Sequence, residues 1–339
     1  LIRYLKLFLI VYFMKKPLVS IIVLNWNNKE DLEVCLNSLA KQTYPNYEVI
    51  VVDNASTDYS VELVKKKFLN FRLIENKENY GFAKGNNIGI NQANGKYIIT
   101  LNNDTKVDSK WIEEYVKVAE KHPEVGSLSC KMLFFDKLSI INSIGLKLYW
   151  DGKAVDEGIN EPDKGQYEEI KEVFGPCGGS AFFRKEALED VKLDNDYYDS
   201  DFGFYSEDLD LAFRLQLKGW KCLYVPKAKL FHKFRGTTGK IKEFGVYYGI
   251  KNKIFFIIKN YPLRLIILYS PIIVIRQIIS FLYYLIKLNK RAFQSRMLIF
   301  WYLPKMLRKR WKIQGTRKVS YSRIRSLLYK ISLFDALFR

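Results

Sequence analysis

Three short runs of aliphatic and β-branched residues recur in the first third of the chain, with helix-like patterns between them. The runs at 19–24, 47–52 and 97–101 are almost continuously apolar, which predicts strands buried on both faces. Apolar side chains recur at helical spacing in the segments 31–41, 61–68 and, more weakly, 82–93. This alternation predicts an α/β fold with an open sheet and right-handed crossovers.

Polar side chains directly follow these predicted strands: Asn25 and Asn27, Asp53 and Asn54, and Asn102-Asn103-Asp104. In an open α/β sheet, ligands bind beyond the carboxyl ends of the strands, so we expect these residues to line one site. Beyond residue 126 the pattern loosens into short strands and turns. A helix is predicted again at FYSEDLDLAFRLQLKGW, with Leu209, Phe213 and Leu217 on one face.

Asp104 is a candidate for metal chemistry, because Mg²⁺ or Mn²⁺ takes oxygen ligands and can bridge the phosphates of a leaving diphosphate. The alternative is that Asn-Asn-Asp-Thr is a turn that caps the next helix. Asp53 also has two interpretations. It can accept hydrogen bonds from a base or ribose, or it can form an Asx turn ahead of a helix cap at Asp58 or Ser60.

Further along the chain, other segments contain candidate chemistry. The run 79–87 could bring backbone amides and Lys84 close to phosphates, although it also suits the start of a helix. Glu207, Asp208 and Asp210 begin the later helix, where the helix dipole favours acidic residues, but three carboxylates also suit a general base. His232 follows a predicted strand and is either a structural residue or a metal ligand.

Charge divides the chain at about residue 250. Residues 251–339 contain 20 Lys and Arg residues and one acidic residue, Asp335, which accounts for the whole net charge of +19. This asymmetry indicates two functional parts, which we place at 14–250 and 251–339. Residues 1–13 are apolar but too short to span a bilayer, and we expect them to be a non-native or weak extension ahead of Met14.

The four cysteines, Cys35, Cys130, Cys177 and Cys222, are isolated in the sequence, with no CxxC pair and no histidine cluster to complete a zinc site. We expect reduced, mostly buried thiols. Free thiols of this kind are typical of a cytosolic compartment.

Taken in order, these motifs resemble glycosyltransferase family 2, the inverting group with a single Rossmann-like catalytic domain of GT-A type. The resemblance covers roughly residues 17–260 and rests on VSIIVLNWN, VDNASTD, NYGFAKGNN, LNNDT, GPCGGSAFF, YSEDLDLAFRL, His232 and YYGIKNKIFFIIKNYP. LNNDT and the SEDLDLAFR helix are most similar to the rhamnosyltransferase-like branch. The resemblance implies a metal-dependent hexosyltransferase in cell-surface polysaccharide synthesis.

The resemblance also implies roles for the matching residues. Asp208 would be the general base, with Glu207 beside it in the acceptor site, and Gly178, Gly179 and Ser180 would border the sugar or acceptor. Asp104 and His232 would bind Mg²⁺ or Mn²⁺. The expected donor-binding residues are Asn25, Asn27, Asp53, Asn54, Lys84, Asn86, Asn103 and Asp104. The donor would be dTDP-rhamnose or a UDP-hexose, and the acceptor a hydroxyl of a saccharide or lipid-linked saccharide.

Two positions depart from the family pattern. The usual Asp-x-Asp is Asn102-Asn103-Asp104 here, which leaves one carboxylate and predicts a lower metal affinity. Lys251-Asn252 stands where many members carry Arg-Asn. Lysine keeps the charge but loses the bidentate fork of arginine.

The basic region contains an apolar stretch at 263–288. Pro271 breaks it, and Arg276 lies near its centre, where a lipid-buried charge costs about 3 kcal/mol or more, so we do not expect a simple spanning helix. A polar stripe (Arg276, Ser280, Tyr284, Lys287, Arg291) lies opposite an apolar stripe (Ile278, Ile279, Leu282, Leu285, Ile286). This pattern predicts an amphipathic, membrane-associating helix that binds anionic lipids at the cytoplasmic membrane face, as a peripheral or monotopic attachment.

Other interpretations explain less of the chain. A membrane- or nucleic-acid-binding protein without transferase activity leaves residues 1–250, whose net charge is zero, unexplained, and we expect no nucleic acid partner. A packed helical subdomain is the alternative for the basic region, but the excess of cations disfavours it. The NWNN after the first strand lacks the GxGxxG of dinucleotide-dependent oxidoreductases, and the glycine-rich loop of sugar nucleotidyltransferases is also missing.

Overall fold

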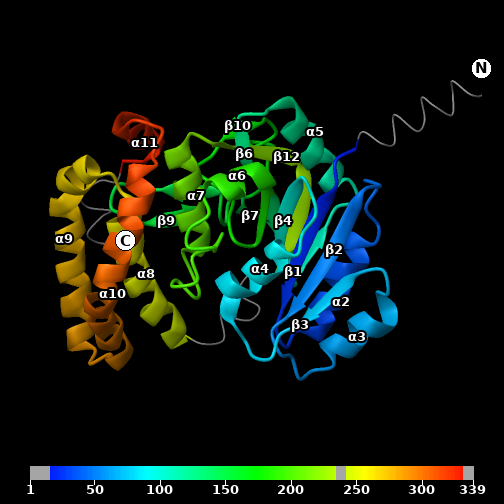
Figure 1. The fold of residues 1–339 in the computed structure, drawn as a ribbon, viewed down its shortest axis with the longest axis horizontal. Helices are drawn as coiled ribbons and strands as arrows, with labels where there is room; N and C mark the ends of the chain where they lie inside the picture. The colour runs from blue at the N-terminus through cyan, green and yellow to red at the C-terminus, as the bar shows by residue number, and fades with distance from the viewer. Residues whose placement is uncertain (1–15, 234–241, 331–339) are drawn as a thin grey trace, which may run out of the picture.

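The computed structural model describes residues 16–233 and 242–330, so the segment 1–13 and the proposed start at Met14 lie outside the described residues. Within the described ranges, the centre is a mixed ten-stranded sheet, with helices packed against it and a group of C-terminal helices at one side (Figure 1). The strand order is β10-β12-β6-β11-β4-β1-β2-β3, with β5 paired to β12 and β7 to β6.

The parallel part of the sheet contains the three predicted strands, β1 (Val19–Asn25), β2 (Tyr47–Asp53) and β4 (Tyr97–Asn102). β1 lies between β2 and β4 and pairs with both in parallel, which confirms the prediction. A short strand, β3 (Arg72–Glu75), extends the sheet beyond β2. Because Asn25 aligns with Asp53, and Leu24 with Asn102, the polar residues after these strands meet at one edge.

The remaining strands are β5 (Thr105–Val107), β6 (Val125–Phe134), β7 (Lys137–Ser143), β8 (Leu146–Leu148), β9 (Ala154–Asp156), β10 (Lys171–Glu172), β11 (Ser180–Arg184) and β12 (Lys221–His232). β11 runs antiparallel between β4 and β6, so the sheet is mixed. β8 and β9 form a separate hairpin. β12 is parallel to β6 and antiparallel to β5, which places His232 opposite Thr105.

Helices pack on both faces of the sheet: α2 (Lys29–Leu39), α3 (Ser60–Lys67), α4 (Gly81–Asn91), α5 (Trp111–Lys121), α6 (Lys185–Asp190) and α7 (Glu207–Lys218). Alternate residues of β1 serve the two faces, with Ile21 in the core cluster shared with α2 and α5, and Ile22 in the cluster shared with α4 and α6. α7 is buried on two sides, because Phe213 belongs to the first cluster and Leu215 to the second.

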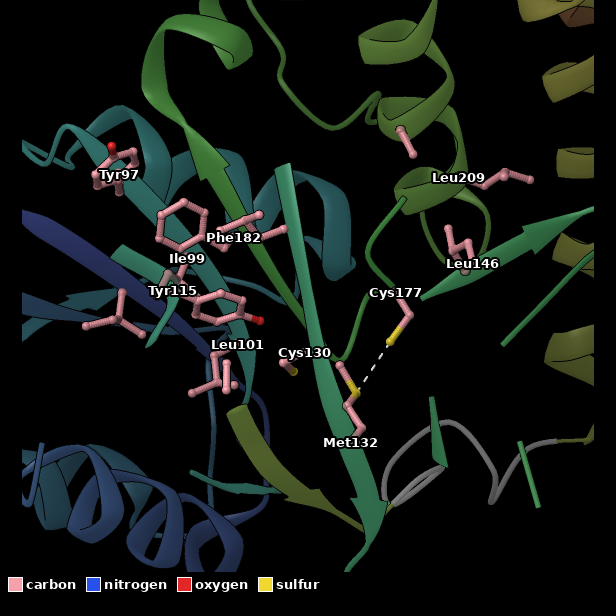
Figure 2. Close-up of a cluster of buried hydrophobic side chains, with 14 of the residues drawn as sticks. Tyr97, Ile99, Leu101, Tyr115, Cys130, Met132, Leu146, Cys177, Phe182 and Leu209 are labelled. Carbon is pink, nitrogen blue, oxygen red and sulfur yellow. Dashed lines mark hydrogen bonds between the residues drawn. The ribbon is translucent and has the colours of Figure 1, made fainter. Parts of the chain in front are cut away.

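The larger core cluster includes aromatic contacts between β4, β11 and α5 (Figure 2). The ring centroid of Phe182 lies 4.9 Å from that of Tyr97 and 5.0 Å from that of Tyr115. In the same cluster, Cys177 Sγ lies 3.5 Å from Met132 Sδ (Figure 2). All four cysteines are free and buried, as predicted.

α4 confirms the weakest of the three predicted N-terminal helices. It contains glycines, which have low helix propensity, but its glycines allow it to approach β1 closely. A Cβ atom at Gly89 would lie 2.5 Å from Cγ2 of Ile22, and one at Gly85 would lie 2.5 Å from Cδ1 of Leu24. Tertiary packing against β1 therefore stabilises this helix where its own propensity does not.

The C-terminal region is mainly helical, as predicted, with α8 (Lys242–Asn260), α9 (Leu263–Ile286), α10 (Lys290–Gly315) and α11 (Tyr321–Leu327). The predicted break at Pro271 is wrong, because α9 continues through it. Proline has no N–H to donate to the carbonyl of Ile267, and the hydroxyl of Ser270 donates to that carbonyl instead (2.9 Å). Within the described part of the chain, α9 is the one helix long and apolar enough to cross a membrane, by length and composition alone.

The two predicted stripes of α9 have different surroundings. From the polar stripe, Arg276 pairs with the buried Asp151, which belongs to residues 14–250, the expected catalytic region. Ser280 accepts a hydrogen bond from Arg296 of α10 (2.9 Å). The apolar stripe is exposed along its whole length: Ile278, Ile279, Leu282, Leu285 and Ile286. Two residues of the polar stripe thus bond to other parts of the protein, and the apolar stripe lies at the surface. The membrane association of this helix stays a prediction.

α8 and α10 pack against the catalytic region. Phe255 and Phe256 of α8 and Met306 of α10 belong to the larger core cluster. Cations of α10 and the segment after it pair with catalytic-region carboxylates: Lys305 with Asp201, Lys309 with Asp199, Lys312 with Asp194, and Lys318 with Asp190. α8 and α10 are therefore packed helices, the alternative that the excess of cations disfavoured. The charge argument failed because the carboxylates that pair with these cations lie far away in the sequence.

Candidate functional site

A cavity of about 510 Å³ lies at the carboxyl ends of β1 and β4 and reaches the N-terminal end of α7. Its volume is within the range of about 300–1,000 Å³ that is usual for small-molecule sites. The fold brings nine of the predicted site residues to its wall: Asn25, Asn54, Asn103, Asp104, Gly178, Gly179, Glu207, Asp208 and His232.

The side chain of Asn25 connects the loops that follow β1, β2 and β4. Its amide nitrogen donates to Asp53 Oδ1 (2.9 Å), and its Oδ1 accepts from the amide of Asn103 (2.6 Å). Asp53 Oδ2 accepts from the backbone N–H of Ser56, three residues further along the same loop (2.8 Å). The predicted helix cap at Asp58 or Ser60 is wrong, because the N-cap of α3 is Tyr59 and makes no side-chain cap bond. These bonds between protein groups hold the three loops in place relative to one another.

Asn103 and Asp104 form the turn between β4 and β5, whereas α5 begins at Trp111, so the helix-cap interpretation of this sequence is wrong. The pairing of β5 with β12 places His232 Nε2 at 3.2 Å from Asp104 Oδ1. His232 Nδ1 lies 2.9 Å from Oδ1 of Asn142. With a cation bound at Asp104, donation of Nδ1–H to Asn142 would leave the Nε2 lone pair for that cation, which is the usual arrangement of a metal-ligating histidine.

Asp104 and His232 are suited to supply two ligands to a divalent cation. Among residues 16–233 and 242–330, no group of three or more His, Cys, Asp or Glu side chains is arranged to hold a metal ion. A cation at Asp104 would therefore take its other ligands from donor phosphates and water, as Mg²⁺ commonly does at phosphate sites. The residues present fit a cation that binds together with its donor.

Asp208 lies in the first turn of α7, on the cavity wall. Its Oδ2 accepts from the backbone N–H of Gly178 (2.8 Å), and its Oδ1 accepts from that of Leu209 (2.7 Å). Burial raises the pKa of this carboxyl to about 6, against the lowering effect of its backbone donors. A carboxylate that titrates near neutral pH and is held by two donors suits a general base.

The other two carboxylates of this turn differ from Asp208. Glu207 is buried on the cavity wall, and burial together with the charge of Asp208 raises the pKa of its carboxyl well above its usual value. Asp210 is fully buried, with Oδ2 at 2.9 Å from Arg214 Nε and Oδ1 at 2.6 Å from Lys259 Nζ. Two of the three acidic residues therefore belong to the cavity, and the third is a structural ion-pair partner.

Five predicted residues do not line the cavity: Asn27, Asp53, Lys84, Asn86 and Ser180. Asp53, Asn86 and Ser180 are buried. Asn27 Oδ1 accepts from a backbone N–H of the loop after β2 (2.7 Å), and Lys84 Nζ lies 3.7 Å from the ring centroid of Tyr80. Their proposed parts in donor or acceptor binding stay predictions.

The cavity also includes residues that the sequence analysis did not select. Asn142 and Asp156 reach it from β7 and β9, in the segment without clear periodicity, where no sequence signal distinguishes them. Burial raises the pKa of the Asp156 carboxyl. Trp26 and Tyr205 also line the cavity. Their positions in the sequence, next to Asn25 and two residues before Glu207, could have identified them as site residues.

Comparison with known proteins gives a family match over just over half of the chain. Residues 20–192 match the family model described as Glycosyl transferase family 2. The O-antigen biosynthesis protein RfbC of Myxococcus xanthus is 28% identical over 226 residues, which cover 64% of this chain and 17% of that protein. The poly-beta-1,6-N-acetyl-D-glucosamine synthase of Staphylococcus epidermidis is 27% identical, over 62% of this chain and 48% of the synthase. The chain thus spans less than half the length of either relative.

A solved structure with the same fold is GalNAc-T7 with UDP, GalNAc and Mn²⁺. The TM-score is 0.61 at 16% sequence identity, over 78% of this chain and 51% of GalNAc-T7. At this identity the likeness shows the fold alone. The mixed sheet and its surrounding helices are of GT-A type, as the sequence resemblance implied.

Proposed function

This chain belongs to glycosyltransferase family 2, and from that premise we propose that it moves a sugar, with inversion, from a nucleotide diphosphate donor to an acceptor hydroxyl. The observation that carries the proposal is the presence of Asp208 and Asp104 on the wall of one cavity. We propose dTDP-rhamnose or a UDP-hexose as donor, and a saccharide or lipid-linked saccharide as acceptor. The named relatives in O-antigen and poly-N-acetylglucosamine synthesis support a part in cell-surface polysaccharide synthesis.

On the acceptor side, Asp208 removes the proton of the attacking hydroxyl. Its two backbone hydrogen bonds hold the carboxylate in one orientation, and its pKa of about 6 leaves it ionised at neutral pH. The hydroxyl oxygen forms the new bond to the anomeric carbon while the bond to the diphosphate oxygen breaks. Glu207, whose raised pKa favours the protonated form, is placed to donate a hydrogen bond to the acceptor.

On the donor side, we propose that the nucleotide or its phosphates bind against the loops that Asn25, Asn54 and Asn103 hold together. Asp104 and His232 would hold a Mg²⁺ or Mn²⁺ ion. Such an ion supplies Lewis-acid stabilisation of the departing diphosphate. GalNAc-T7, which has the same fold, was solved with Mn²⁺ and UDP, and this supports the choice of metal class.

A donor screen tests the proposal. Release of nucleotide diphosphate is measured across UDP-, dTDP- and GDP-sugars, with Mg²⁺, with Mn²⁺ and with a chelator. We expect release from one class of donor, lost with the chelator and restored by either metal. Absence of release from every donor in the presence of a saccharide acceptor pool would reject transferase activity for the chain.

We also propose that the apolar stripe of α9 lies in the cytoplasmic leaflet of a membrane. The stripe is an exposed aliphatic surface, Trp301 and Trp311 of α10 are both 80% exposed, and residues 251–330 contain no acidic residue. Exposed apolar side chains, exposed tryptophans and an excess of cations are each typical of surfaces that bind anionic lipids. A chain held at a membrane in this way would suit a lipid-linked acceptor.

Vesicle flotation tests the membrane proposal. Vesicles of phosphatidylglycerol and phosphatidylcholine should carry the chain upward, and Ile286→Glu combined with Leu282→Glu should abolish flotation. The control is Leu69→Glu, because Leu69 is as exposed (81%) as Ile286 (83%) but lies outside the C-terminal region. Equal flotation of all three proteins would contradict the proposal, and retention on DNA at matched salt without flotation would favour a nucleic-acid partner.

A further inference from the structure

We infer that Asn252 of α8 and Lys309 of α10 are positioning residues that hold the loop before the proposed base in its working conformation. This loop, residues 199–206, is called the α7 loop below. The inference rests on the proposed function, because it assigns a role toward Asp208. It also gives the C-terminal region a part in catalysis that is separate from membrane attachment.

The α7 loop forms part of the active-site wall. Phe204, Tyr205 and Ser206 line the cavity and lead directly into Glu207 and Asp208. Tyr205 and Ser206 both have φ of +68°, a left-handed conformation that non-glycine residues keep only where their surroundings enforce it. The path of this loop decides where the base lies, so the contacts that enforce its conformation bear on catalysis.

Asn252 supplies the first of these contacts. It is fully buried, and its amide nitrogen lies 3.0 Å from the carbonyl oxygen of Phe202 and 2.7 Å from each of those of Phe204 and Tyr205. The two N–H donors of one amide are thus shared among three backbone carbonyls of the α7 loop. Removing it would leave buried carbonyl groups without that donor, which favours a different loop conformation.

Lys309 supplies the second contact, from a helix that is far away in sequence. Its ammonium lies 2.5 Å from Asp199 Oδ1 and 2.6 Å from Asp201 Oδ2, so it bridges two carboxylates at the start of the α7 loop. Asp199 is buried and also pairs with Lys259 (2.5 Å). Removing Lys309 leaves Asp201 with the more exposed Lys305 alone, and Asp199 with Lys259 alone.

The donor side of the cavity has separate supports. Asn25 fixes the loops after β1, β2 and β4, and Asn54 bonds to Asn76 (2.8 Å) and Asn79 (3.1 Å). Neither set involves α8 or α10. Loss of the α7 loop contacts should therefore displace the base and leave donor binding intact.

The test compares Asn252→Ala, Lys309→Met and Lys309→Arg with the control Lys312→Met. Lys312 lies on the same helix and also pairs with an aspartate, Asp194, but outside the α7 loop. Three quantities are measured. Calorimetry gives the affinity for UDP, dTDP and GDP, and turnover is measured with the donor found in the screen. Mass spectrometry gives the amide hydrogen exchange of residues 199–209.

We expect Asn252→Ala and Lys309→Met to lower kcat by about 10- to 100-fold, the scale of a misplaced catalytic group, with nucleotide affinity within about twofold of wild type. Exchange of the α7 loop should speed up in both. Lys309→Arg should recover most of the turnover, and Lys312→Met should match wild type in every measurement.

Unchanged exchange in the α7 loop of both variants would overturn the inference, as would a kcat within twofold of wild type. Parallel loss of nucleotide affinity and kcat would also overturn it, since it would indicate a general structural role. A wild-type chain that releases no nucleotide diphosphate would reject the proposed function, and the exchange data would still decide whether these residues hold the loop.

Discussion

At the scale of single residues, Asn25 illustrates what a sequence can and cannot predict about this site. The topology of an α/β sheet brings the residues after parallel strands together, so the sequence predicts Asn25, Asn103 and Asp104 at one edge. Which polar atoms bond to one another depends on loop conformation. For Asp53, no local pattern shows that one side-chain oxygen accepts from Asn25 and the other from the backbone of Ser56 in its own loop, and its contact with the nucleotide stays a prediction.

Replacing Asp208 with asparagine tests the base directly. The amide cannot take a proton, so Asp208→Asn should lower kcat by about 100- to 10,000-fold, the usual contribution of general acid–base catalysis. The amide is close to the carboxyl in size, so nucleotide affinity should stay near that of wild type. Titration calorimetry with the nucleotide supplies the control, and a variant with near-normal turnover would show that another group is the base.

The pH dependence of wild-type transfer follows from the raised pKa of Asp208. The base works only as a carboxylate, and burial raises its pKa to about 6. kcat/KM should therefore fall about tenfold per pH unit below that value, and level off above it. A profile measured between about pH 4.5 and 8.5 checks this, and a flat profile down to the ordinary pKa of an aspartate would contradict it.

At the scale of elements, secondary structure is predicted correctly where the apolar pattern is regular, and is missed where the pattern is irregular. β1, β2, β4 and α2 have clear apolar patterns and lie where predicted. The strands β7 to β10 have two to seven residues each, which is too short for a pattern to stand out, and four unselected cavity residues come from them: Asn142, Leu146, Ala154 and Asp156. Pro271 predicts a break that does not occur, because the hydroxyl of the neighbouring Ser270 donates to the carbonyl that proline leaves without a donor.

The close packing of α4 on β1 gives an element-scale prediction. Gly89→Ala would place a methyl group against Ile22 and should destabilise the fold by about 1–3 kcal/mol, the usual cost of overpacking. The matched control is Gly249→Ala in α8, where a Cβ atom meets open space and should add up to about 1 kcal/mol of stability. Denaturant unfolding gives the free energy of unfolding of both variants. Equal changes in the two variants would show that Gly89 does not need to be small to pack against Ile22.

At the scale of the whole molecule, composition cannot show which of the excess cations form ion pairs within the fold. Some cations of the C-terminal region pair with carboxylates of the catalytic region, and Arg276 pairs with the buried Asp151. The exposed apolar stripe of α9 is the surface that we propose lies in a membrane. A charge count predicts attraction to lipid, but it cannot identify which cations already have partners across the fold.

Because α8 and α10 share a core with the sheet, the catalytic and C-terminal regions should unfold together. Phe255, Phe256 and Met306 belong to the same cluster as residues of β1 and α2. Scanning calorimetry should show a single transition with equal calorimetric and van't Hoff enthalpies. Two separate transitions would mean that the C-terminal helices form an independent unit, which would also weaken the role inferred for Lys309.

The most direct test of the account is the anomeric configuration of the product. Proton NMR can follow the sugar as it leaves the donor found in the screen, before the free sugar equilibrates between its anomers. A single displacement assisted by Asp208 predicts an anomer opposite to that of the donor, for transfer to an acceptor and for hydrolysis alike. A product with retained configuration would contradict the one-step mechanism and the assignment of Asp208 as its base.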